Sequence, residues 1–445
     1  MVVNAHIIEI NDSEIRVAKD AKIILRSPGI AVVNNNDIHV GESASKMAYL
    51  NPRETYNRYW NKLNQDALHT PTKYYQHYAD LAYAHLMTIY EQAGNPEELI
   101  FVVPGSYSSK QLSMLLGIAQ ACPFTAVGLI DSAVAGSAAV VTSAGEYQHI
   151  DMHLHQIVIT RLDVGNRVSQ IAVETIDEAG LHKIYTIMAG LVSDLFIQQS
   201  RFDPQRHAET EQALYDQLPA CLKALRDEKV IMLEIQYRNT THQAKLSRDI
   251  LLQRLQPVYE KLTGKISRSI PCVIGDRLAS LPGITDSISP VHVIKPEAVF
   301  ESCQTNEAYI RSTGPELSFI TSLPTEKNQI RTIIEPSPSS EEILRDKNVT
   351  HVLYRDEAYP INEQTIYLSA NGNVSNHKPQ DMLCSVSSQN GVTILMTDTN
   401  SPVLINGKVA GNSTELHPGD RVQTNNSEVY YSFIHVLTSH GTHKT

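Results

Sequence analysis

The sequence has little of what marks a membrane, secreted or nucleic-acid-binding protein. Acidic residues outnumber basic ones among its 445 residues, and the formal net charge is −11. This lack of positive charge argues against non-specific binding to nucleic acid or anionic membranes, because no basic surplus exists to release counterions. No hydrophobic run approaches the length of a bilayer span. Residues 1–8 have neither the basic start nor the apolar segment of a signal peptide.

Cysteine and tryptophan are also scarce, with five cysteines and one tryptophan in the chain. The cysteines stand far apart, are odd in number and form no C-x-x-C pair, which argues against a disulfide framework. Free thiols in a reducing compartment are therefore expected, and with them a soluble, cytoplasmic protein. The five positions are Cys122, Cys221, Cys272, Cys303 and Cys384.

Histidine is present in number but scattered, and its densest run is His149-Ile-Asp-Met-His-Leu-His155. The run lacks the partner spacing of a known metal site. It also falls between two predicted segments. We interpret it as a surface loop, and no metal site is predicted from the sequence.

The chain is too long for one compact core, and two or three domains are expected. Two short strands flank the turn-forming Asn11-Asp12-Ser13. Thr70 and Pro71 predict the start of a helix that Gly94 ends. Residues 99–139 read as strand, helix, strand and Ala-rich helix, so a partly parallel sheet is implied. Residues 156–162 and 167–173 predict two further strands about the turn 163–166.

The C-terminal quarter has a different pattern. Residues 323–348 include Glu335-Pro-Ser-Pro-Ser-Ser-Glu-Glu342, a composition that cannot pack and predicts a linker. Residues 349–440 show short β runs with frequent turns, which is typical of an all-β sandwich.

The run Gly41-Glu-Ser-Ala-Ser-Lys-Met-Ala48, followed by Asn51-Pro-Arg-Glu-Thr55, resembles the start of the nucleotide-binding domain of DnaK-type heat-shock chaperones. That family has G-E-x-A-x-x-x-A leading into N-P-x-x-T. Residues 99–139 match the family's next elements in order. The resemblance implies an α/β actin-like (ribonuclease H-like, duplicated) domain over 1–322, with halves of about 1–150 and 151–322.

The resemblance also implies where ATP would lie, and the nucleotide-cleft candidates are Asn11, Asp12, Ser13, Asp131, Asp163, Gly165, Asn166 and Gly275. Two hairpin loops and a glycine turn must bring backbone close to phosphate and adenosine, and carboxylates must position Mg²⁺. The family's D-L-G-T-T aligns with Glu9-Ile-Asn-Asp-Ser13, and its D-L-G-G-G-T with Arg161-Leu-Asp-Val-Gly-Asn166. Its phosphate-contacting lysine falls on Trp60. Of its G-D-x-x-L-G-G run, only Gly190 stands near.

These departures add side chains and reverse charge where phosphate would lie, and they predict loss of hydrolysis. No catalytic residue is assigned. Binding of ATP or ADP with Mg²⁺ stays open as an alternative, because Arg161 and Lys62 could meet phosphate. Ordinary turn and cap roles for Asp131 and Asp163 stay open too.

The segment Asp398-Thr-Asn-Ser-Pro-Val-Leu-Ile-Asn-Gly-Lys-Val409, followed by Leu416-His-Pro-Gly-Asp-Arg-Val422, resembles forkhead-associated domains. Asn406-Gly407 predicts a tight hairpin turn. The arginine with which those domains bind phosphothreonine is missing near Ser369–Gly372, and their serine–histidine pair is missing near Asp381–Ser385. Asn400 matches the family's peptide-binding asparagine. A protein-interaction module that needs no phosphate is expected.

Taken together, the sequence predicts a cytoplasmic, bacterial DnaK-like pseudo-ATPase. It would act as an adaptor or scaffold that reaches protein partners through its forkhead-associated-like domain. Two alternatives are an ATP-driven switch that controls that domain and a phosphopeptide-binding signalling protein. Filament formation, as in bacterial actins, has little support in the sequence.

Overall fold

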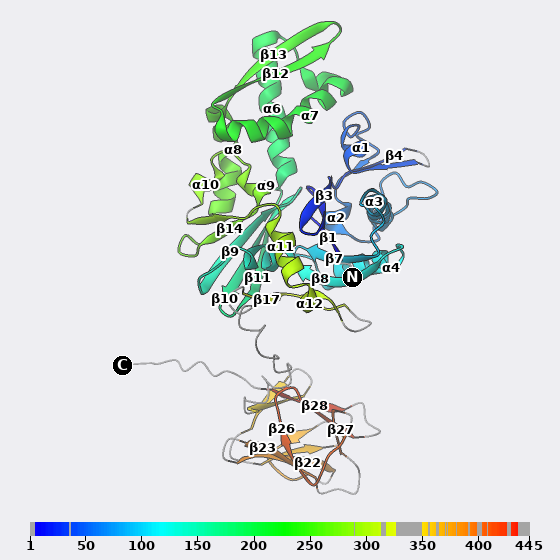
Figure 1. Ribbon diagram of the computed structural model, residues 1–445, viewed down its shortest axis with the longest axis vertical. Coiled ribbons are helices and arrows are strands. Elements are labelled where there is room, and N and C mark those ends of the chain that lie inside the picture. The colour runs from blue at the N-terminus through cyan, green and yellow to red at the C-terminus, as the bar shows by residue number, and fades with distance from the viewer. Residues whose placement is uncertain are drawn as a thin grey trace. The chain divides into compact units, whose positions relative to one another are not determined.

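The chain folds into two compact units, residues 1–331 and 332–445 (Figure 1). The computed structural model describes residues 5–34, 37–288, 290–312, 317–325, 349–354, 357–361, 365–369, 371, 373–379, 381–389, 392–397, 403–406, 408–424 and 429–434.

The first unit contains a six-stranded sheet, the first sheet, in the order β16-β8-β7-β1-β2-β3. Strands β1, β2 and β3 form an antiparallel meander, and β1, β7 and β8 run parallel. The buried run Leu99–Val103 makes the centre of β7, as its unbroken apolar sequence predicts. The strands are β1 (His6–Glu9), β2 (Ile15–Lys19), β3 (Lys22–Ser27), β7 (Glu98–Val103), β8 (Thr125–Asp131) and β16 (Phe319–Ile320).

A second sheet of the same unit repeats this arrangement in the order β15-β14-β9-β10-β11-β17. Here β9, β10 and β11 form the antiparallel meander, and β14 runs parallel to both β9 and β15. Apart from the edge strands β16 and β17, the two sheets share one topology. The strands are β9 (Gly145–Met152), β10 (Gln156–Val164), β11 (Arg167–Asp177), β14 (Cys272–Ile274), β15 (Val291–Val293) and β17 (Ser322–Pro324).

Helix α5 (Ser132–Ala138) lies against strands of both sheets, including β8 and β11. All seven of its residues are buried and none is larger than valine, so the backbone can approach both sheets closely. The other helices of the two repeats are α3 (Tyr78–Gln92), α4 (Ser109–Gln120), α6 (Leu181–Ser200), α9 (Asp276–Ala279), α10 (Ile284–Ser287), α11 (Ala298–Thr305) and α12 (Glu307–Ile310).

Two smaller groups of elements extend from the sheets (Figure 1). The first is a three-stranded sheet, β5-β4-β6, with two short helices. The second is the hairpin β12–β13, which packs with α6, α7 and α8. Their bounds are β4 (Ala31–Asn34), β5 (Asp37–Val40), β6 (Thr55–Tyr56), α1 (Glu42–Ser45), α2 (Tyr59–Lys62), η1 (Pro204–Arg206), α7 (Ala208–Asp227), β12 (Val230–Tyr237), β13 (Thr240–Ser247) and α8 (Arg248–Thr263).

The second unit consists of two antiparallel sheets, in the orders β19-β18-β28-β27-β24-β25 and β21-β20-β22-β23-β26. Both contribute to one core, with Val352 and Phe433 from one sheet and Leu368 and Leu395 from the other. The strands are β18 (His351–Tyr354), β19 (Glu357–Pro360), β20 (Ile366–Ser369), β21 (Val374–Ser375), β22 (Met382–Gln389), β23 (Val392–Met396), β24 (Val403–Ile405), β25 (Lys408–Val409), β26 (Ser413–Leu416), β27 (Arg421–Thr424) and β28 (Tyr430–Ile434).

The structure is thus mixed α/β with a C-terminal, all-antiparallel region, as expected at that coarser level. Residues 323 and 324 of the predicted linker belong to β17, Thr325 follows it, and residues 326–348 lie outside the described residues. One helix start was predicted wrongly, because α3 begins at Tyr78 and not near Thr70. Among the described residues, no helix is long and apolar enough to cross a membrane.

Candidate functional site

The first hairpin turn, residues 10–14, contacts the second sheet through its polar side chains. The Asn11 amide donates to Asp151 Oδ2 at 3.0 Å and to the Met152 carbonyl at 3.1 Å. The Leu154 amide donates to Asp12 Oδ1 at 2.7 Å. Ser13 instead bonds within its own turn, to Asn11 Oδ1. Two of the three predicted residues therefore join the two sheets, while Ser13 shapes the loop.

The turn after β14 returns two charged residues toward the first sheet. Gly275 precedes α9, and an added Cβ there would lie 3.3 Å from Asp151 Oδ1. Arg277 reaches both Glu9 carboxylate oxygens, at 3.1 and 2.8 Å, and also the Glu14 carbonyl. Asp276 accepts two bonds from Arg16, at 2.8 and 2.7 Å. Two bidentate arginine–carboxylate pairs thus cross between the sheets.

The Arg277–Glu9 pair is buried, whereas in the second pair Arg16 is 4% exposed and Asp276 is 31% exposed. The Arg277 and Glu9 side chains are only 8% and 5% exposed. Burial disfavours charge on Arg277, yet Glu9 raises the pKa of its guanidinium above the ordinary value. Burial likewise opposes a charged Asp276, but Arg16 holds the pKa of that carboxyl below its usual range. Each charge therefore depends on its partner in the other half.

Asp131 is the last residue of β8 and Glu9 is the last residue of β1. Both therefore lie at the carboxyl ends of parallel strands in the first sheet. It is fully buried and caps α5, accepting the Val134 amide at 2.8 Å. Burial raises the pKa of Asp131 to about 6. Its Oδ2 has no hydrogen-bond partner among the described residues, and an added Cβ on Gly105 would lie 2.3 Å from it. The cap role left open by the sequence is therefore present.

The histidine run is not a surface loop, and that interpretation is wrong. His149 and Asp151 belong to β9, and His153 and His155 lie in the turn to β10; all four are at most 6% exposed. The buried Ile150 and Met152 alternate with them, as in a strand covered on both faces. His153 Nδ1 lies 3.3 Å from Asp12 Oδ1, and its Nε2 lies 3.5 Å from Asp151 Oδ2.

Asp163, Gly165 and Asn166 lie elsewhere, which corrects the expectation that they share one cleft with Asp131. They sit at the β10–β11 turn and are exposed. The nine-residue strand β10 separates that turn from His155, a length of roughly 30 Å at about 3.3 Å per residue. Because β9 and β10 repeat β1 and β2, the counterpart of the Asn11–Ser13 turn is 153–155.

A second contact between the two halves of the first unit lies near the Gly41–Tyr56 run. The rings of Tyr49 and Tyr215 stack with their centroids 3.6 Å apart. Gln212 of α7 accepts the Tyr49 amide and donates to the Ser45 carbonyl, each at 2.9 Å. Gln212 is 6% exposed, so this contact excludes water as well as bridging the halves.

Little space remains between the two ion-paired loops. A hollow of about 10 Å³ is lined there by Glu9, Arg16, His149, Asp151 and Arg277, among other residues. That is the lower limit for a single water molecule, whereas small-molecule sites occupy about 300–1,000 Å³. A nucleotide with Mg²⁺ does not fit between these loops in this arrangement.

Trp60, at the aligned position of the family's lysine, is buried and part of the core. Its indole Nε1 donates to His85 Nδ1 at 3.0 Å, and His85 Nε2 lies 2.7 Å from Ser27 Oγ. Indole is only a donor, so Nδ1 must accept and Nε2 must carry the proton. Burial lowers the pKa of His85 to about 3. Trp60 therefore belongs to a neutral, buried hydrogen-bond network with Tyr59, His85 and Ser27.

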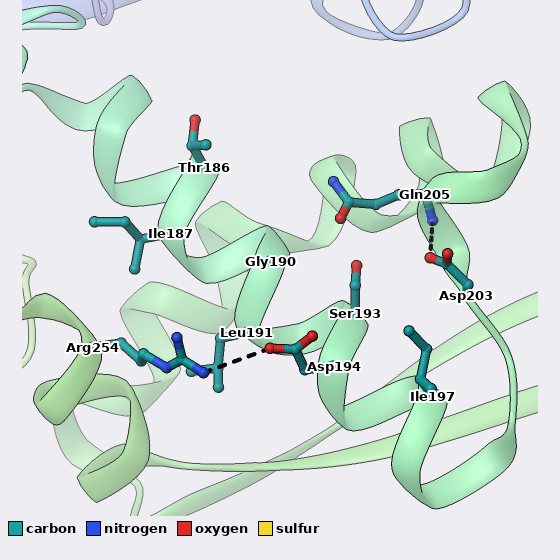
Figure 2. A pocket seen from close by; sticks show the side chains of 10 residues that line it. All are labelled: Thr186, Ile187, Gly190, Leu191, Ser193, Asp194, Ile197, Asp203, Gln205 and Arg254. Atoms are coloured by element: carbon teal, nitrogen blue, oxygen red, sulfur yellow. Dashed lines mark hydrogen bonds and ion pairs between the residues drawn. The ribbon is translucent and has the colours of Figure 1, made fainter.

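A larger hollow, of about 570 Å³, lies on α6 beside Gly190 (Figure 2). Asp194 and Arg254 form an ion pair at 3.6 Å on one side, and Asp203 accepts the Gln205 amide on the other. None of the eight predicted site residues lines it. Gly190 thus belongs to a different part of the surface from the ion-paired loops.

No protein-family model and no curated protein matches the chain. Within the residues that the structure describes, no three His, Cys, Asp or Glu side chains are grouped to hold a metal ion. The site is therefore a set of buried ion pairs and hydrogen bonds between two sheets of equal topology. Sequence reasoning singled out Asn11, Asp12, Asp131 and Gly275 but assigned no role to Arg16, Asp151, His153 or Arg277.

Proposed function

We propose that residues 1–322 form an actin-like, DnaK-type body that no longer hydrolyses ATP and serves as a scaffold. The C-terminal unit would be a forkhead-associated-like module that binds protein partners. The observation that carries the proposal is the pair of bidentate bridges, Arg277–Glu9 and Arg16–Asp276, between the loops that would hold a triphosphate.

The repeated strand order supports the actin-like assignment. Each sheet places an antiparallel meander beside two parallel strands joined through helices. The hairpin β12–β13 with α7 and α8 is inserted in the second repeat, and β4–β6 with α1 and α2 in the first. Such a duplication forms a cleft between two parallel-strand edges, which is where ligands bind in open α/β sheets. In this chain the charged side chains of two arginine–carboxylate pairs, Arg277–Glu9 and Arg16–Asp276, occupy that place.

Protein side chains pair with the charges that a bound ligand would otherwise contact. This pairing supports a scaffold role over an ATPase role. An ATPase must exchange ligands, but here Arg277 is paired with Glu9 and Arg16 with Asp276, and removal of one partner leaves the other charge uncompensated. The contact of Tyr49 with Gln212 and Tyr215 of α7 adds a second bridge between the halves. A body joined at both places suits a fixed platform better than a switch.

Contacts in the C-terminal unit support partner binding without a phosphate requirement. Asp381 accepts the Asn371 amide at 2.8 Å, in the loops where the related domains would bind phosphothreonine. A carboxylate there repels phosphate. Asn406 bonds Asp420 and the Arg421 amide, and so ties two turns of the unit together. Asn400 and Gly407 lie outside the described residues.

Nucleotide binding is the direct test. We expect that millimolar ATP with Mg²⁺ neither raises the unfolding temperature of the purified protein nor releases phosphate. A ligand present at one hundred times its Kd would add about 2.7 kcal/mol of stability, so at millimolar ATP calorimetry would detect binding with a Kd of about 10 μM. ADP with Mg²⁺ and Mg²⁺ alone serve as parallel samples.

Mg²⁺-dependent turnover that Asp131→Ala abolishes would overturn the proposal. A thermal shift with ATP but no turnover would instead favour the ATP-controlled switch. Asp163→Ala is the matched control, since that carboxylate lies at the end of β10 that is far from the 153–155 turn. Turnover that persists unchanged in both variants would indicate a contaminating ATPase.

A further inference from the structure

One imidazole lies between two carboxylates that belong to different halves of the first unit. Asp12 follows β1 of the first sheet, whereas Asp151 belongs to β9 of the second. His153 Nδ1 lies 3.3 Å from Asp12 Oδ1 and its Nε2 lies 3.5 Å from Asp151 Oδ2. A neutral imidazole has one N–H and can donate to one side only. His153 Nε2 makes no hydrogen bond within the described residues, so its 3.5 Å contact with Asp151 is favourable only as an ion pair, and that requires the imidazolium.

The surrounding charges also call for a proton here. Asp12 faces His153 from the first sheet, Asp151 and His149 face it from β9, and Arg277 faces it from α9, while Glu9 acts on the neighbouring His149 and His155 acts on Asp12. These are three carboxylates and one guanidinium, and Arg277 is held by Glu9. Apart from His153, the groups that donate hydrogen bonds to Asp12 and Asp151 are uncharged amides: the Leu154 backbone for Asp12, and the Asn11 side chain and the Met152 backbone for Asp151.

Burial makes that imbalance costly. Asp12, Asp151 and His153 are 3%, 6% and 4% exposed, so water does not screen the two carboxylates from each other. Asp12 Oδ2 has no hydrogen-bond partner in the described part of the chain. Two buried carboxylates flanking a neutral ring would repel, while a charged ring attracts both.

We propose that Asp12, His153 and Asp151 form a proton-dependent latch that holds the two sheets together at the inner end of the cleft. With the proton present, the charged ring bridges the halves. With the proton lost, the carboxylates repel and the hydrogen bond from Leu154 to Asp12 opens more often. The latch follows from these contacts alone and does not depend on whether the body ever bound nucleotide.

The pH range in which the latch is stable follows from the pKa values of His153 and Asp12. Burial lowers and the two carboxylates raise the pKa of His153, and the net result lies above the ordinary 6.5. The stabilisation by this histidine is therefore full below pH 6.5 and is lost as pH rises through the raised pKa. His153 also lowers the pKa of Asp12 against the effect of burial. The stabilisation by Asp12 is present above its ordinary 3.8 and is lost as pH falls through the lowered pKa.

Hydrogen exchange of the Leu154 amide measures the latch, because that amide bonds across it. We expect its protection factor in the wild-type protein to fall at least tenfold from pH 6 to pH 9, after correction for intrinsic exchange. In His153→Gln, which keeps a donor but no charge, protection should be lower at pH 6 and change little with pH. His155→Gln is the matched control, since that ring bonds the Asn57 carbonyl, and it should keep the wild-type slope.

An unchanged pH slope in His153→Gln would overturn the latch, as would a His155→Gln slope that is lost to the same extent. Nitrogen-15 NMR of the wild-type imidazole decides the matter even if the variant fails to fold. Both His153 ring nitrogens protonated at pH 6 supports the proposal. One unprotonated nitrogen at that pH refutes it, because the bridging proton would then sit on a carboxylate.

Discussion

The Arg277–Glu9 pair is the residue-scale feature on which the interpretation of the cleft depends. Buried ion pairs bring little net stability compared with a well-packed apolar core, but they are costly to break on one side only. The same pair carries a third bond, from Arg277 to the Glu14 carbonyl. Arg277 therefore positions the first hairpin relative to α9 as well as balancing charge.

Removing only the arginine should be severe. We expect Arg277→Met to lower the free energy of unfolding by about 3–5 kcal/mol, because Glu9 is left as an unpaired buried carboxylate. The double variant Glu9→Leu with Arg277→Met should recover most of this loss. Denaturant titration followed by circular dichroism measures both.

Arg161→Met is the control, because its partner Glu146 is half exposed and the two side chains are 49% and 45% accessible. Its loss should not exceed about 1 kcal/mol. Equal losses in Arg277→Met and Arg161→Met would contradict a structural role for the buried pair.

Residue chemistry was predictable in part. The sequence shows that glycine and charge are altered at 9–13 and near 275, and both segments do lie in the ion-paired region. It could not show that Arg16 and Arg277 meet those carboxylates, because the partners are about 260 residues apart. Such pairings depend on the register of the two sheets, which no local pattern encodes.

At the scale of elements, α6 begins at a tight approach to the preceding turn. An added Cβ on its cap residue, Gly180, would lie 2.5 Å from the Gln156 nitrogen and 2.6 Å from the His153 oxygen. Both obstacles are backbone atoms and cannot rotate away. By contrast, nothing lies within 4 Å of an added Cβ on Gly190, ten residues along the same helix (Figure 2).

The two glycines should therefore respond to alanine with opposite signs. We expect Gly180→Ala to cost about 1–3 kcal/mol of stability through overpacking against the 153–156 backbone. Gly190→Ala should add up to about 1 kcal/mol, since alanine is the better helix former in open space. Urea midpoints of the two variants make the comparison. A Gly180→Ala protein as stable as wild type would show that the turn can move.

Element prediction succeeded where local chemistry decides. The helix expected within residues 99–139 is α4, which Ser108 caps and where Ser108 shares a capping box with Gln111. It failed at Thr70, because the Asp80 carboxylate accepts the Gln76 and His77 amides and starts α3 there instead. It failed again at 149–155, where polar residues that resemble a loop are buried among charges from the other half.

The counterpart of the first hairpin turn was misplaced for a similar reason. The resemblance to the chaperone family placed it at 161–166, but the meander makes that turn point to the opposite end of the sheet from the 153–155 turn. Only the repeated strand order identifies 153–155 as the counterpart of the first hairpin. Topology, not motif, carried that information.

At the scale of the molecule, the two units have separate hydrophobic cores. The core residues of the second unit, such as Leu395 and Phe433, form one cluster that contains no residue of the first. Domains with separate cores unfold as separate cooperative units unless a large interface couples them.

Calorimetry should therefore resolve two transitions whose positions respond to different substitutions. Leu395→Ala, at a fully buried position, should lower one of them, in line with a loss of about 2–5 kcal/mol from a core cavity. Arg277→Met should lower only the other. A single transition that both variants shift equally would mean that the units unfold together.

The last described strands of the first unit have a mechanical consequence. Phe319–Ile320 pair in parallel with β8 of the first sheet, and Ser322–Pro324 pair antiparallel with β11 of the second. Leu323, in the middle of β17, is completely buried and belongs to a hydrophobic core with residues of both sheets, such as Val102 and Leu162. Tension applied to the polypeptide beyond Thr325 would therefore load both sheets through a single short ribbon. Peeling that ribbon away would be the first step by which pulling separates the halves.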